Sequence, residues 1–102
     1  MPDKNALWSK AELQAAVSAY ARLWREQQSG KDPAKAEMLS GLLHGPLSAR
    51  TKGSIEYRMA NISAVMVAAG KPFAQGYVPA KNVGPKNFAV IEQMLRTEGL
   101  LD

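Results

Sequence analysis

Residues 8–30, WSKAELQAAVSAYARLWREQQSG, decide the fold class because they carry the complete signature of an amphipathic helix. The stretch opens with a capping box, in which the Ser9 hydroxyl accepts from the Glu12 amide and the Glu12 carboxylate accepts from the Ser9 amide. Trp8 and Leu13 flank the cap with the spacing of a hydrophobic staple. Apolar side chains then recur every three or four residues, so one face of the helix turns toward a core. A glycine ends the pattern.

Three further helices are expected, each bounded by proline, glycine or a capping residue. Their ranges are 33–44 with Asp32 as N-cap, 54–69 with Ser54 as N-cap, and 85–98 with Gly99 as terminator. Residues 73–84 are rich in Gly, Pro and Asn, which favours an extended, ordered loop and allows a short strand at 76–78. The sequence predicts one all-α domain over residues 1–102. It has a three-helix, helix-turn-helix-like core at 8–70, then a loop and a closing helix at 71–101.

The composition excludes several classes of site. The chain has 102 residues, no Cys and one His, so it cannot build a zinc finger, an iron–sulfur site or a disulfide scaffold. The single histidine, His44, is expected to cap carbonyls at the end of the second helix. We therefore expect no catalytic residues, no metal and no cofactor. The central apolar stretch 62–69 is too short to span a bilayer, and no signal-peptide core follows residues 1–5, so a cytoplasmic protein is expected.

The positive charge is concentrated in one part of the chain. The formal net charge is +4, yet residues 50–87 carry six cations and only one acid, Glu56, so this window alone is +5 and the remainder is −1. The six cations are Arg50, Lys52, Arg58, Lys71, Lys81 and Lys86. A basic stretch of this kind suits a polyanion such as nucleic acid, or is simply a solvated basic surface.

The third helix has an unusual outer face. Instead of Lys and Glu it presents Ala60, Ala64 and Ala68, together with Tyr57 and Asn61. Small residues let a helix approach another surface closely, so this face indicates either a recognition helix in the DNA major groove or a helix buried against the fourth helix or a partner chain.

These observations predict a double-stranded DNA site. Base edges would be met by Tyr57, Arg58 and Asn61, and phosphates at the helix start by Arg50, Thr51, Lys52 and Ser54. The DNA backbone beside the helix would be held by Lys71, Lys81, Lys86 and Asn82. Tyr77, in the same basic loop, either inserts toward nucleic acid or packs against the core and holds the loop there.

Three blocks together also resemble a known family. They are WSKAEL at 8–13, RTKGSIEYRMANISAV at 50–65 and GYVPAKNVG at 76–84. Over residues 8 to 95 the chain is similar to the N-terminal helical domain of bacterial HNH-type, McrA-like restriction endonucleases, and its arginine–asparagine pattern also resembles Myb and homeodomain modules. The resemblance implies a DNA-reading or DNA-positioning module of a defence nuclease, able to sense a sequence, a modified base or duplex shape. The nuclease's metal-binding His and Asn constellation is absent, so hydrolysis is not predicted.

A protein-interaction module is the rival hypothesis. In that case the alanine strip of the third helix packs against a partner helix, a nuclease domain or a second copy of the chain. The module would then be a dimerisation domain or a small phage or bacterial regulator.

Overall fold

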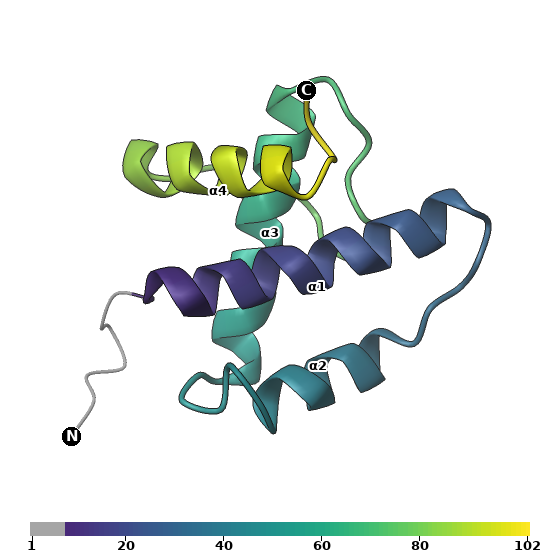
Figure 1. The fold of residues 1–102 in the computed structure, drawn as a ribbon, viewed down its shortest axis with the longest axis vertical. Coiled ribbons are helices and arrows are strands. Elements are labelled where there is room, and N and C mark those ends of the chain that lie inside the picture. The colour runs from purple at the N-terminus through teal and green to yellow at the C-terminus, as the bar shows by residue number, and fades with distance from the viewer. Residues whose placement is uncertain (1–7) are drawn as a thin grey trace.

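The computed structural model describes residues 8–102, which form four α-helices and no β-strand (Figure 1). The helices are α1 (Lys10–Gln28), α2 (Lys35–Leu43), α3 (Lys52–Ala68) and α4 (Pro85–Thr97). The all-α prediction is therefore confirmed. Residues 1–5, where the absence of a signal-peptide core was noted, lie outside the described residues.

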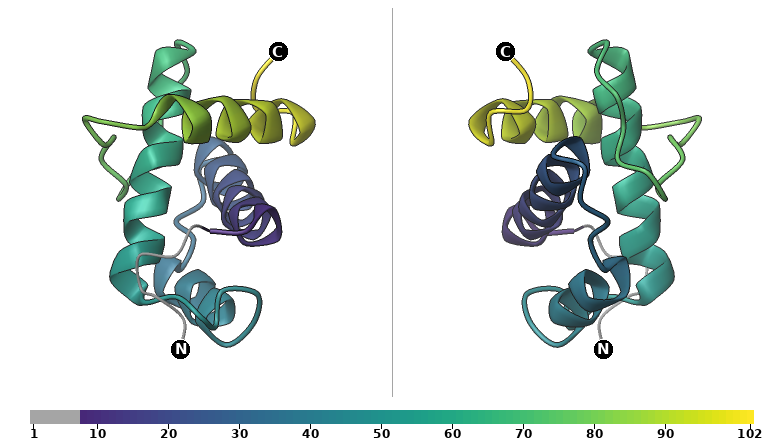
Figure 2. Two further views of the ribbon diagram at one scale, coloured as in Figure 1. Left: turned by 90° about the vertical axis from the view of Figure 1, so that its left-hand side faces the viewer. Right: turned by 90° about the vertical axis from the view of Figure 1, so that its right-hand side faces the viewer.

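The third helix, α3, is the central element. The helices α1, α2 and α4 all contact it and cross it on the same side (Figures 1 and 2). The helix α1 also contacts both α2 and α4, so it fills the space between them. The loop between α3 and α4 returns along α3, where the Ala80 amide donates to the Ala60 carbonyl at 3.0 Å.

The helix starts follow capping chemistry, with two corrections to the sequence prediction. The box at Ser9 is present: its hydroxyl accepts from the Glu12 amide at 3.1 Å, and the Glu12 carboxylate accepts from the Ser9 amide at 2.9 Å. The α3 cap is Thr51 rather than Ser54, because the Thr51 hydroxyl accepts from the Ser54 amide at 3.1 Å. The prediction was wrong by one turn because both hydroxyl residues suit a cap.

The start of α2 also differs from the prediction. The helix begins at Lys35 after Ala34, which makes no side-chain cap bond, so Asp32 and Pro33 precede the helix rather than opening it. At its other end His44 is the C-cap, and its Nδ1 lies 2.8 Å from the Ser40 carbonyl oxygen. The expected capping role of His44 is thus confirmed.

No strand forms at 76–78. The Tyr77 amide instead donates to the Ala74 carbonyl at 3.2 Å, which closes a turn, and Gly76 has a φ of +97°. A left-handed residue at this position breaks the extended path that a strand needs. The side chain of Tyr77 is buried and fixes the loop to the core.

The core is organised around one buried tyrosine. Tyr20 of α1 is fully buried, and its hydroxyl lies 2.9 Å from the Ser63 hydroxyl of α3. The same oxygen accepts from the Ala74 amide at 2.8 Å. An unpaired buried polar group is costly, so these bonds allow Tyr20 and Ser63 to be buried in an otherwise apolar core. The same bonds connect α1, α3 and the loop.

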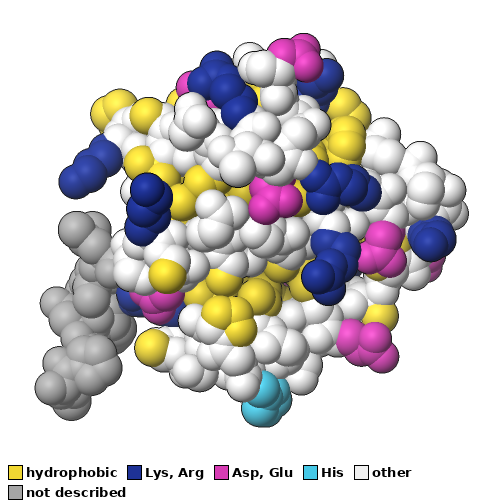
Figure 3. Space-filling view, viewed as in Figure 1, with side chains coloured by type: hydrophobic (Ala, Val, Ile, Leu, Met, Phe, Trp, Pro, Cys, Tyr) yellow, Lys and Arg dark blue, Asp and Glu magenta, His cyan; other side chains and the backbone are white. Residues whose placement is uncertain are grey.

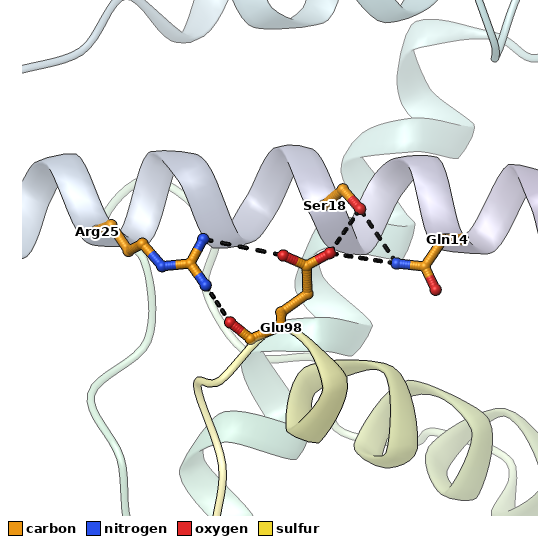
Figure 4. Close-up of polar contacts among 4 residues, drawn as sticks. All are labelled: Gln14, Ser18, Arg25 and Glu98. Atoms are coloured by element: carbon orange, nitrogen blue, oxygen red, sulfur yellow. Dashed lines mark hydrogen bonds and ion pairs between the residues drawn. The ribbon is translucent and has the colours of Figure 1, made fainter.

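A polar cluster holds the end of α4 against α1 (Figure 4). The Glu98 carboxylate accepts from the Ser18 hydroxyl at 2.8 Å and from the Gln14 amide at 3.4 Å. Arg25 forms an ion pair with the same carboxylate at 3.8 Å and donates to the Glu98 carbonyl. These contacts of the Glu98 carboxylate hold the end of α4 against α1.

Candidate nucleic-acid interface

The site begins with an ion pair that fixes the approach to α3. The Arg50 guanidinium donates twice to the Glu12 carboxylate, from Nε to Oε2 at 2.9 Å and from Nη2 to Oε1 at 2.7 Å. This side-chain bond from Arg50 lowers the pKa of Glu12 from 4.5 to about 2, and the backbone bond from Ser9 acts in the same direction. Arg50 is therefore tied to the capping box of α1.

Trp8 lies beneath two guanidinium groups. The Cζ atom of Arg50 is 5.3 Å from the centroid of the Trp8 ring, and the Cζ atom of Arg58 is 5.2 Å from it. Both distances are within the range of cation–π attraction. Burial lowers the pKa of Arg58. The ring thus holds two of the predicted DNA-binding arginines at one place.

Asn61 occupies a structural position. Its side-chain oxygen accepts from Arg58 Nη1 at 3.3 Å, and its amide donates to the Tyr57 carbonyl at 3.0 Å. The residue is only 2% exposed, so its amide orients Arg58 and is not presented to a base edge. Sequence periodicity placed Asn61 on the outer arc of the helix, and the packing of its neighbours covers it.

The outer face of α3 is partly covered by the chain itself. The loop reaches it through the bond from Ala80 to Ala60, and Ala60 and Ala64 are half-buried while Ala68 is exposed. The alternative of a buried alanine strip therefore describes part of this face. Entry of the middle of α3 into a major groove would require the loop to move away.

The remaining predicted residues are dispersed. The Thr51 hydroxyl and the Ser54 backbone amide are occupied by the helix cap, whereas Lys52, Tyr57, Lys81, Asn82 and Lys86 are exposed. Lys71 is half-buried beyond the far end of α3. Tyr77 is 5% exposed, with the Lys35 ammonium 5.6 Å from its ring centroid. The structure therefore brings Arg50, Arg58 and Asn61 together around Trp8, and it places Lys71 and Tyr77 outside that group.

A hollow lies next to Trp8. It has a volume of about 510 Å³ and lies between the start of α1 and the α4 residues from Lys86 to Met94, beside Arg58 of α3. Figure 3 shows Lys and Arg side chains flanking apolar surface in this part of the molecule. The residues that line this Trp8 hollow are Trp8, Lys10, Leu13, Arg58, Lys86, Asn87, Ala89, Val90, Gln93 and Met94.

Most of the lining was not assigned from the sequence. Trp8 was interpreted as half of a hydrophobic staple, and Lys10, Asn87 and Gln93 were given no role. A signal was present, because residues 86, 87, 90, 93 and 94 form one stripe of a helix. The positions of α1 and α3 relative to this stripe are tertiary information, and no local pattern carries it.

A second hollow lies between α1 and α2, with a volume of about 570 Å³. Its lining includes Ala19, Leu23 and Met38, and its charges are mixed: Arg22 against Glu26 and Glu37. It therefore has no electrostatic preference for an anion, in contrast to the Trp8 hollow.

Residues 8–102 contain neither a candidate metal site nor a candidate membrane-spanning helix. No group of three or more His, Cys, Asp or Glu side chains is placed to hold a metal ion. None of the described helices combines the length and the apolar character needed to cross a membrane. Comparison with known proteins found no matching family model, no matching curated protein and no matching solved structure.

Proposed function

We propose that this chain binds duplex DNA through the cationic surface around Trp8. The observation that carries the proposal is the charge of the hollow's lining: three cations, Lys10, Arg58 and Lys86, and no carboxylate. Lys10 and Lys86 are exposed and can meet phosphates, whereas Arg58 is held in place by Trp8 and Asn61. Phosphate contacts of this kind supply most of the affinity of non-specific DNA binding.

The nearby acids do not oppose an anion at this surface. Glu12 is neutralised by Arg50. Glu56, the one acid of the 50–87 window, is two residues from Arg58 and so lies about 200° away around the helix. It lies toward Tyr77, whose pKa is raised first by burial and then by the Glu56 charge.

The N-terminus of α4 adds to the positive potential. Its N-cap, Gly84, offers no side-chain bond, and its first turn contains no acidic residue. A helix start has unpaired amides and a partial positive charge, both of which favour a phosphate. Lys86 and Asn87 belong to this first turn, so the helix start and the hollow are contiguous.

The biological role that we propose is to position a partner activity, such as a nuclease domain, on DNA. This is the role that a resemblance of its sequence to the N-terminal domains of HNH-type endonucleases would imply. Tyr57, which is 56% exposed and follows Glu56 on α3, is available to extend the contact.

Fluorescence anisotropy of a labelled random-sequence duplex tests the proposal. At low salt we expect saturable binding, with a Kd of roughly 10⁻⁶ to 10⁻⁴ M near physiological salt. A cytosine-methylated copy of the duplex shows whether modification matters. Absence of binding at low salt, together with a dimer in sedimentation analysis, would instead favour the protein-interaction module.

A further inference from the structure

We infer that the Trp8 hollow receives one nucleobase that has left the helical stack, with its flanking phosphates held by Lys10 and Lys86. This inference rests on the proposed DNA-binding function and specifies which part of the DNA the hollow would take. Its volume of about 510 Å³ is within the range of roughly 300–1,000 Å³ typical of small-ligand sites.

The floor and walls of the hollow suit a flat ring. The lining includes the apolar side chains of Trp8, Leu13, Val90 and Met94, together with the small, exposed Ala89. Arg58 also lines the hollow, and a base can stack on a guanidinium plane as well as on an aromatic ring.

Two side-chain amides can recognise the edge of the ring. Asn87 is half-buried and Gln93 is exposed, and both line the hollow. Among the described residues, neither side-chain amide has a hydrogen-bond partner. An amide offers a donor and an acceptor side by side, which matches the donors and acceptors of a nucleobase edge.

The charges select an anion at the rim. Lys10 comes from α1, Lys86 from α4 and Arg58 from α3, so the three cations approach from three helices and no carboxylate lines the hollow. The apolar side chains of the hollow suit the base, the two amides suit the edge of the base, and the cations suit the phosphates on either side. Unstacking costs least for a base that is already unpaired, so such a base is the appropriate probe.

The test uses three labelled duplexes of one sequence: fully paired, with one bulged nucleotide, and with an abasic residue at the bulge. The last two differ only in the base. We expect the wild-type chain to bind the bulged duplex about ten-fold more tightly than the abasic one, the size of one base stack. Ala89→Phe places a bulky ring among the lining residues from an exposed position without changing charge, and it should abolish that preference. Ala36→Phe, at an exposed position on α2, should retain it.

The outcomes separate the two proposals. Equal affinity for the bulged and abasic duplexes would show that the hollow does not bind a base. Binding of the fully paired duplex would still measure the DNA-binding function in that case. A preference that survives Ala89→Phe also overturns the base pocket, because the base then binds elsewhere. Failure of all three duplexes to bind at low salt rejects the DNA-binding function and the pocket with it. If Ala89→Phe does not fold, Ala89→Leu puts a smaller apolar side chain at the same lining position and carries the same expectation.

Discussion

Arg50 and Glu12 form a two-pronged ion pair, at 2.7 and 2.9 Å, between the residue that precedes the α3 cap and the capping box of α1. Because Glu12 also caps its own helix, this single contact fixes both helix starts and the position of Trp8 beside them. The surface that we propose for DNA depends on this arrangement, so its stability and its electrostatics can be tested together.

The first prediction concerns pH. The folded-state pKa of Glu12 is about 2, below its ordinary value of 4.5, so the pair stabilises the fold above pH 4.5 and that contribution is lost as the pH falls toward about 2. Urea unfolding across this range should show the free energy of unfolding falling with pH in the wild-type chain. In Glu12→Gln the fall should be smaller, and an equal fall in both chains would contradict the assignment.

The second prediction concerns Asn61. Because its amide is buried and bonds to Arg58 and the Tyr57 carbonyl, Asn61→Ala should lower the free energy of unfolding by about 1–3 kcal/mol. The ratio of affinities for different duplex sequences should stay unchanged. A stable variant with relaxed sequence preference would show instead that Asn61 reads a base.

The third prediction concerns the buried tyrosine. Tyr20→Phe leaves the Ser63 hydroxyl and the Ala74 amide without their partner, which should cost about 1–3 kcal/mol. Tyr57→Phe removes the same hydroxyl at an exposed position and is the matched control, with an expected change within about 0.5 kcal/mol. Denaturant midpoints measure both changes, and similar values for the two variants would refute the role given to the Tyr20 network.

The fourth prediction concerns the fastening of α4. Glu98→Ala removes the acceptor of the Ser18 hydroxyl and the Arg25 ion pair, so it should destabilise the chain by about 1 kcal/mol or more. Glu92→Ala breaks only the ion pair with Arg96 one turn away on α4, worth about 0.3–0.5 kcal/mol. Thermal unfolding should rank the two variants in this order, and the reverse order would rule out the Glu98 cluster as a clamp.

The sequence predicted the parts of the fold that local chemistry determines. The capping box at Ser9, the C-cap at His44 and the start of α4 at Pro85 all follow from residues within one turn. The α3 cap was misplaced because Thr51 and Ser54 satisfy the same local rule. The prediction of a strand at 76–78 was wrong because Tyr77 is buried by a tertiary contact, and the chain forms a turn there.

The candidate site was less predictable for a different reason. Its predicted arginines do meet, but around Trp8, and the partner of Arg50 lies 38 residues away in sequence. The burial of Asn61 and the docking of Ala80 on Ala60 likewise depend on how distant segments pack. Helical periodicity identifies which residues share a face, and it does not identify what covers that face.

The salt dependence of duplex binding distinguishes the cations of the Trp8 surface from the other positive charges of the chain. Lys10→Gln with Lys86→Gln removes two exposed cations of the Trp8 surface, and Arg22→Gln with Lys31→Gln removes two exposed cations elsewhere. We expect the first pair to flatten the slope of log K against log salt by about 2 and to weaken binding to all sequences. The second pair should leave the slope near that of the wild-type chain. Equal slopes for both variants would contradict the assignment of this surface to DNA.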